Sequence, residues 1–181
     1  MRRVVLLLAV GLAALVLLSG CGSKSNSSTS ATVDWASNLC TAITTWKTSV
    51  DSAVNSVSSS NVSRSSLQKA ADQVESATET FVDSLKKLGK PQTTAGAQAK
   101  TTLDQLSTQI SSERDKIKTA TSGVTSISGI IAAAPTVLES LKTMRTDVST
   151  TYKQLQTLDA SGELSKAFKQ ANACTTLTKS G

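Results

Sequence analysis

The chain of 181 residues contains no histidine, and its only aromatic residues are two Trp, one Tyr and two Phe. Without histidine, the commonest general base and the commonest metal ligand are both missing. The sequence also lacks a phosphate-binding glycine loop, a Gly-x-Ser-x-Gly motif and a Cys-x-x-Cys motif. We therefore expect a protein that is not an enzyme and that has no cofactor and no metal site.

A basic cluster is missing as well. The formal net charge is +6, but Lys and Arg are spread along the chain with few aromatic residues among them. Nucleic-acid interfaces concentrate positive charge in one patch, whereas a modest and dispersed charge serves solubility. We expect no nucleic-acid partner.

What is present begins with a cationic start, Met1-Arg2-Arg3, followed by an uninterrupted apolar run over residues 4–18. The run is long enough for the core of a signal peptide, but it is shorter than the about 20 residues of a membrane-spanning helix. It closes on a leucine, two small residues and a cysteine: Leu18, Ser19, Gly20 and Cys21. This pattern predicts an export signal.

The closing four residues resemble the lipobox of bacterial lipoproteins. The resemblance implies that diacylglycerol is attached to the Cys21 thiol, that cleavage occurs between Gly20 and Cys21, and that further acylation, typically by palmitate, gives a permanent anchor. It places the protein on the extracytoplasmic face of a bacterial cell membrane, with the bilayer as a partner. The alternative is an ordinary secretory signal or an uncleaved membrane helix, with Cys21 a bystander.

Three segments follow from this interpretation. Residues 1–20 are a cleaved lipoprotein signal peptide, residues 21–32 are the lipidated cysteine and a flexible Ser-rich tether, and residues 33–181 are one helical domain. Loss of Arg2 and Arg3 with the leader lowers the net charge from +6 to +4. The Ser/Thr- and Ala-rich domain is similar to small helical lipoproteins of high-GC Gram-positive bacteria, a likeness that names no function.

Apolar residues at steps of three or four predict four long helices, over about residues 33–59, 63–88, 94–122 and 137–158. Ser65 and Gln68 have the spacing of a capping box at the second helix, and Gly89 and Pro91 are typical of its end. We expect a turn around Gly123, although a helix continuing to Pro135 keeps the same period. A short fifth helix is expected over about residues 163–174.

Four helices with short connections favour an up-down-up-down bundle. Cys40 and Cys174 remain once Cys21 is assigned to the lipid, and an exported protein with one such pair is expected to form one disulfide. The alternative is two buried free thiols. The predicted fold class is all-α: an up-down-up-down four-helix bundle with a short C-terminal fifth helix, and one disulfide joining the first helix to the C-terminus.

Carboxylates recur along the second helix at Asp72, Glu75, Glu79 and Asp83. Acidic side chains can hold a cation, but sites of the bundle type usually add imidazole. We interpret this stripe as a solvated edge whose repulsion is offset by Lys and Arg of adjacent helices.

Two functions are consistent with such a bundle. The first is a non-catalytic interaction module of the cell envelope, because residues 123–134 are unusually apolar for a connection. A protein partner would contact Val124, Ile127, Ile130 and Ile131, and the alternative is that these side chains pack within a helix.

The second possible function is a carrier of an apolar small molecule held between helices near Trp35 and Trp46. Its alternative is that both rings belong to the core or lie over Arg145 or Lys47. An exposed apolar tip over a filled core would favour the module, and an enclosed pocket at the two rings would favour the carrier.

Overall fold

The computed structural model describes residues 24–58, 62–159 and 161–179, and every regular element in these ranges is an α-helix. The helices are α1 (Lys24–Ser58), α2 (Arg64–Leu88), α3 (Gly96–Thr121), α4 (Ile127–Thr157), α5 (Glu163–Gln170) and α6 (Asn172–Lys179). The prediction of an all-α helical bundle is confirmed. The lipobox residues Leu18, Ser19, Gly20 and Cys21 lie outside the described residues.

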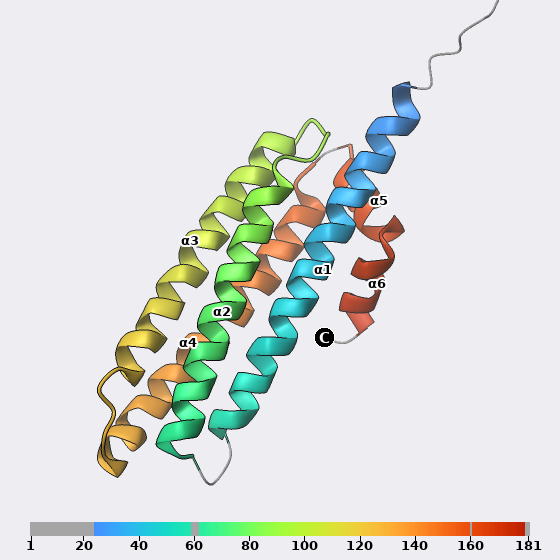
Figure 1. Ribbon diagram of the computed structural model, residues 1–181. Coiled ribbons are helices and arrows are strands. Elements are labelled where there is room, and N and C mark those ends of the chain that lie inside the picture. The colour runs from blue at the N-terminus through green and yellow to red at the C-terminus, as the bar shows by residue number, and fades with distance from the viewer. Residues whose placement is uncertain (1–23, 59–61, 160, 180–181) are drawn as a thin grey trace, which may run out of the picture.

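The four long helices lie side by side, with α2 between α1 and α3, while α5 and α6 pack against α1 (Figure 1). α4 packs mainly on α3 and makes smaller contacts with α1 and α2. One end of the bundle holds the start of α1 and the connection between α2 and α3 (Figure 1). The opposite end, which we call the tip end, holds the end of α1, the start of α2 and the turn between α3 and α4.

The apolar stripe of each long helix faces one common core. Leu39 and Val50 of α1, Val74 of α2, Ile110 of α3 and Leu141 of α4 are all 0% exposed, and they belong to a single cluster of buried residues. Burial of such side chains contributes about 1.5–3 kcal/mol each and is the main force that holds the helices together. The apolar residues that recur at helical spacing in the sequence are therefore the residues that form this core.

The cap at the start of α2 lies two residues before the position that the sequence suggested. Ser63 has extended backbone angles, and its Oγ accepts a hydrogen bond from the Ser66 amide at 3.1 Å. The Ser66 Oγ in turn accepts from the Ser63 amide at 2.9 Å, which completes a reciprocal capping box. The expected pair of Ser65 and Gln68 is wrong, because the residue with the extended backbone is Ser63.

Glycines with positive φ end α2 and mark the turn after α3, as predicted. Gly89 has φ 62° and Gly123 has φ 76°, a region that residues with a Cβ rarely adopt. After this turn, the Ser126 Oγ accepts a hydrogen bond from the Gly129 amide at 3.2 Å and caps α4. Because α4 begins at Ile127, Pro135 lies inside the helix and not in its first turn.

Three element boundaries differ from the prediction, and the first is the start of α4, which lies at Ile127 and not at about residue 137. α1 begins at Lys24, so residues 24–32 are helical, and Thr32 is buried; the flexible tether expected there is wrong for this part. Helix propagation costs little once a packed helix exists, so a polar segment can extend it. The expected fifth helix is two helices, because Ala171 has extended backbone angles (φ −75°, ψ 112°) between α5 and α6.

Cys40 of α1 and Cys174 of α6 form a disulfide, with their Cα atoms 5.0 Å apart. Both residues are buried, at 0% and 1% exposure. The predicted pairing is confirmed, and the alternative of two free thiols is excluded. The bond fixes the last helix to the side of α1.

Candidate functional site

Two places in the described part of the chain have the character of a binding surface: the turn and first turns of α4 at the tip end, and a groove between α1 and α2. The sequence pointed to both regions through the patch at residues 123–134 and through Trp35 and Trp46. Their geometry differs, because one projects from the bundle and the other is hollow.

At the tip end, Ile127 and Ile131 are 77% and 69% exposed, and they are the two exposed large hydrophobic residues of the described chain. They are four positions apart on a helix and therefore share one face. Val124 and Ile130 are half-buried, and Val124 packs against the core. The predicted patch is thus divided, because two of its members face solvent and two are half-buried.

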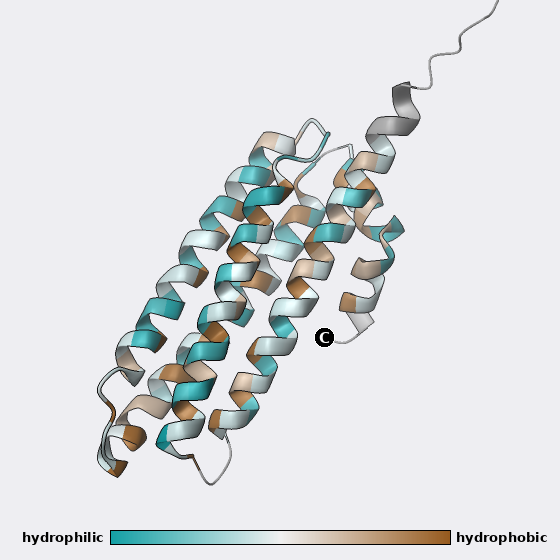
Figure 2. Cartoon of the chain, viewed as in Figure 1, coloured by the Kyte–Doolittle hydropathy of each residue, from teal (hydrophilic) through white to brown (hydrophobic). Residues whose placement is uncertain are grey.

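The surroundings of these isoleucines carry no charge in the sequence. Between Lys118 and Glu139 there is no Asp, Glu, Lys or Arg, while small residues such as Gly129 and Ala132 fill the positions around Ile127 and Ile131. Figure 2 shows hydrophobic residues at this start of α4, at the end of the bundle. A contiguous apolar surface without charges is typical of contact sites, whereas single exposed apolar residues need no explanation.

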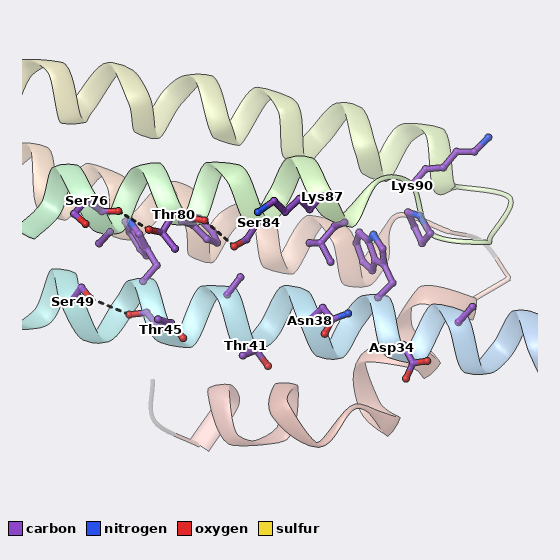
Figure 3. A pocket seen from close by; sticks show the side chains of 18 of the residues that line it. Asp34, Asn38, Thr41, Thr45, Ser49, Ser76, Thr80, Ser84, Lys87 and Lys90 are labelled. Atoms are coloured by element: carbon purple, nitrogen blue, oxygen red, sulfur yellow. Dashed lines mark hydrogen bonds between the residues drawn. The ribbon is translucent and has the colours of Figure 1, made fainter.

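The groove between α1 and α2 has a volume of about 980 Å³ (Figure 3). One face of each helix lines it, and most of these side chains are small, among them Ala42, Thr45, Ala77 and Thr80. Two helices whose facing residues are small on their outer side leave a hollow there, because nothing bulky fills the space between them. The groove is open to solvent along the outside of the bundle.

Trp35, Trp46 and Phe81 contribute to the lining of the groove although each ring is almost fully buried. The Trp46 ring stacks on Phe81 with ring centroids 5.4 Å apart, and its Nε1–H donates to the Thr78 Oγ1 at 3.4 Å. The Trp35 and Phe168 rings pack in a T-shaped arrangement with their centroids 6.2 Å apart, and the Trp35 Nε1–H donates to the Gly89 carbonyl at 3.2 Å. Both rings are core residues, as the packing alternative predicted. The pocket at the rings is therefore an open groove and not the enclosed cavity that would favour a carrier.

Charged side chains lie in the half of the groove that is nearer the connection between α2 and α3 (Figure 3). Lys87 lies along its rim beside Ser84, Lys90 extends outward near its end, and Asp34 is on the α1 side (Figure 3). In the sequence, these residues do not differ from the other charged residues that are spread along the chain. The signal that could have found Lys87 and Lys90 is their position in the chain: they lie at the end of α2, directly after the small residues that line the groove.

The acidic stripe of α2 is a solvated edge, as predicted. Lys118 of α3 contacts Glu75 at 2.6 Å, and Arg114 of α3 lies 3.6 Å from Glu79. The hydrogen bond to Glu75 and the charge of that carboxylate raise the pKa of Lys118 above its usual value. These contacts account for two of the four carboxylates.

A different carboxyl group is perturbed between α3 and α4. Burial raises the pKa of Asp147 above its usual value, and the nearby Glu113 raises it further. Burial also raises the pKa of the Tyr152 hydroxyl. In residues 24–58, 62–159 and 161–179, no group of three or more His, Cys, Asp or Glu side chains is placed to hold a metal ion.

Comparison of the chain with models of protein families, with curated proteins and with solved structures found no match to any of them. None of the helices in the described ranges has an apolar stretch long enough to cross a membrane.

Proposed function

We propose that this protein is a lipid-anchored, extracytoplasmic interaction module of a bacterial cell envelope, and that its tip end binds a protein partner. The observation that carries the proposal is the exposure of Ile127 and Ile131, at 77% and 69%, within a stretch of the chain that has no charged residues between Lys118 and Glu139. Removal of such side chains from water contributes roughly 25 cal/mol per Å² of apolar surface, which gives an incoming protein a reason to bind there. No catalytic role is assigned to any residue.

The arrangement of the chain supports this assignment. We infer an up-down-up-down order for α1 to α4, in which an even number of passes returns the chain to the end where α1 begins. The 35 residues of α1 extend about 52 Å at a rise of about 1.5 Å per residue. An anchor at Cys21 would therefore hold the isoleucines far from the membrane, where a partner can reach them.

Site-specific crosslinking in intact cells tests the proposed contact. A photoreactive residue at Ile131 should give a discrete crosslinked product, whereas the same residue at the exposed Glu79 should not. Adding Ile127→Ser to the Ile131 probe should remove most of the product, because the two side chains share one face. Equal products from both positions, or none from either, would refute a partner at the tip end.

The anchor requires its own measurement. Mass spectrometry of the protein purified from membranes should show a chain that begins at Cys21 and carries diacylglycerol and a further acyl chain. Replacement by Cys21→Ala should release the protein from the membrane or leave its leader uncut. An unmodified Cys21 in the purified chain would disprove the lipoprotein assignment without touching the tip contact.

A further inference from the structure

The groove between α1 and α2 has the dimensions of a ligand site for one slender molecule. Its volume of about 980 Å³ lies at the upper end of the roughly 300–1,000 Å³ of small-molecule sites. On α1 the lining extends from Ala31 to Ser49, which corresponds to about 27 Å along the helix axis. The groove is therefore long and narrow, and a compact or branched molecule would leave much of it unfilled.

The walls of the groove are less polar than their composition suggests. The hydroxyl groups of Thr41, Thr80 and Ser84 each donate to a backbone carbonyl four residues earlier, at 2.8–2.9 Å. Figure 3 shows the bond between Thr80 and Ser84 along the wall. Because these donors are used within their own helices, the threonine methyl groups and the half-buried Ala42 and Ala77 dominate what a ligand would touch. Such walls favour an aliphatic chain.

The charges at one end of the groove favour an anion. Lys87 and Lys90 are exposed and have no acidic partner among the described residues, whereas their neighbour Lys86 lies 3.9 Å from Asp83. Asp34, on the opposite side, is the one acidic residue of the lining, so the end of the groove keeps an excess of positive charge. A ligand with one negative group at one end would complement this distribution.

We propose that the α1–α2 groove binds a single-chain anionic amphiphile, with its aliphatic chain between the helices and its carboxylate or phosphate at Lys87 and Lys90. The head group then lies at the end of the bundle where α1 begins and α2 meets α3. The aliphatic chain points toward the tip end, over the stacked rings of Trp46 and Phe81. This site is separate from the protein contact at the tip end, and neither proposal depends on the other.

Intrinsic fluorescence gives a direct test, because the only two tryptophans of the chain, Trp35 and Trp46, both line the groove. The full protein, held in nanodiscs of zwitterionic lipid, is titrated with 9,10-dibromostearate, whose bromines quench tryptophan at short range. We expect saturable quenching of at least half of the emission. The uncharged methyl ester of the same acid should need at least a tenfold higher concentration for the same quenching.

Matched variants separate a site from simple partition into the lipid. The double variant Lys87→Glu/Lys90→Glu should raise the half-saturating concentration of the acid at least tenfold. The double variant Lys153→Glu/Lys166→Glu changes the net charge equally at exposed positions outside the groove, and it should leave binding unchanged.

Filling the groove should abolish quenching. Ala77→Phe fills it from α2, and Ala42→Leu does so from α1 with a smaller side chain; thermal melting identifies which variants are folded. Quenching that is equal in wild type and in a folded filling variant would overturn the proposal. So would equal potency of the acid and the ester, or equal effects of the two charge-reversal variants.

Discussion

Reduction of the Cys40–Cys174 bond should cost the protein a large part of its stability. The bond closes a loop with a sequence separation of 134 residues. In the chain-entropy account, a loop of this length raises the free energy of the unfolded chain by about 5 kcal/mol. Small domains have a total stability of about 5–15 kcal/mol, so the loss is a third or more of the whole.

The measurement is denaturant unfolding of the oxidised and the reduced protein, followed by far-UV circular dichroism. The reduced wild type isolates the effect of the covalent bond, because both sulfur atoms are still present at Cys40 and Cys174, which are 0% and 1% exposed in the oxidised structure. A Cys40→Ala/Cys174→Ala variant removes the sulfur atoms as well and should be less stable than the reduced protein, since it leaves space in the core.

The unfolding midpoint should fall on reduction while the helical signal in water persists. A difference below about 1.5 kcal/mol between the oxidised and reduced forms would refute the reasoning. It would mean that the unfolded chain is already restricted between these positions, or that α6 detaches alone without affecting the rest of the bundle.

Three other predictions concern stability. Gly96→Ala should destabilise the protein by about 1–3 kcal/mol in thermal or denaturant unfolding, because a Cβ there would overlap the Pro91 carbonyl oxygen. Gly129→Ala is the control, because the nearest atom to its added Cβ is the Ser126 Oγ at 3.4 Å, and it should be neutral or slightly stabilising. Phe81→Ala should lower the free energy of unfolding by about 3–5 kcal/mol, because the ring is 2% exposed. Ile131→Ala, at a position that is 69% exposed, should lower it by less than about 0.5 kcal/mol. Similar losses of stability in the two variants would contradict the assignment of Phe81 to the core. Asp147→Asn should stabilise the protein at neutral pH. The pKa of Asp147 in the folded protein is raised above 3.8 by burial and then by Glu113. The protonated form of Asp147 therefore contributes stability that is complete below about pH 3.8 and is lost as the pH rises through the folded pKa. The gap between the variant and the wild type should therefore widen from about pH 3 to pH 7, and a gap that stays constant would contradict the assignment.

The helices could be predicted because each buries a regular stripe. Leu39 and Ile43 on α1, and Leu103 and Leu106 on α3, recur at the spacing that one buried face requires, and all four are buried. The partnership of Cys40 and Cys174 also followed from the sequence, because the assignment of Cys21 to the predicted lipid site left one pair of cysteines. The apolar periodicity repeats along the chain, and the cysteine pair follows from the number of cysteines, so neither prediction depends on details of packing.

Other boundaries carried no such signal. Ala171 separates α5 from α6, yet it is neither glycine nor proline, and its extended backbone depends on how α6 packs on α1. The sequence pointed to the region of the groove through Trp35 and Trp46, but it did not predict the open shape of the groove, for a related reason. Small residues such as Ala42 and Ala77 are compatible with a tight helix contact as well as with a hollow, and only the packed helices distinguish the two.

The disulfide also has a mechanical consequence. If the chain is held at its N-terminal end and pulled at its C-terminal end, tension passes from Lys24 along α1 to Cys40, across the sulfur bridge to Cys174, and out through the rest of α6. The segment that lies between the two cysteines in sequence, with most of the core and the exposed isoleucines, is bypassed by this covalent route. A force spectroscopy trace should therefore show only a short extension while the bridge is intact, and the full contour length only after reduction.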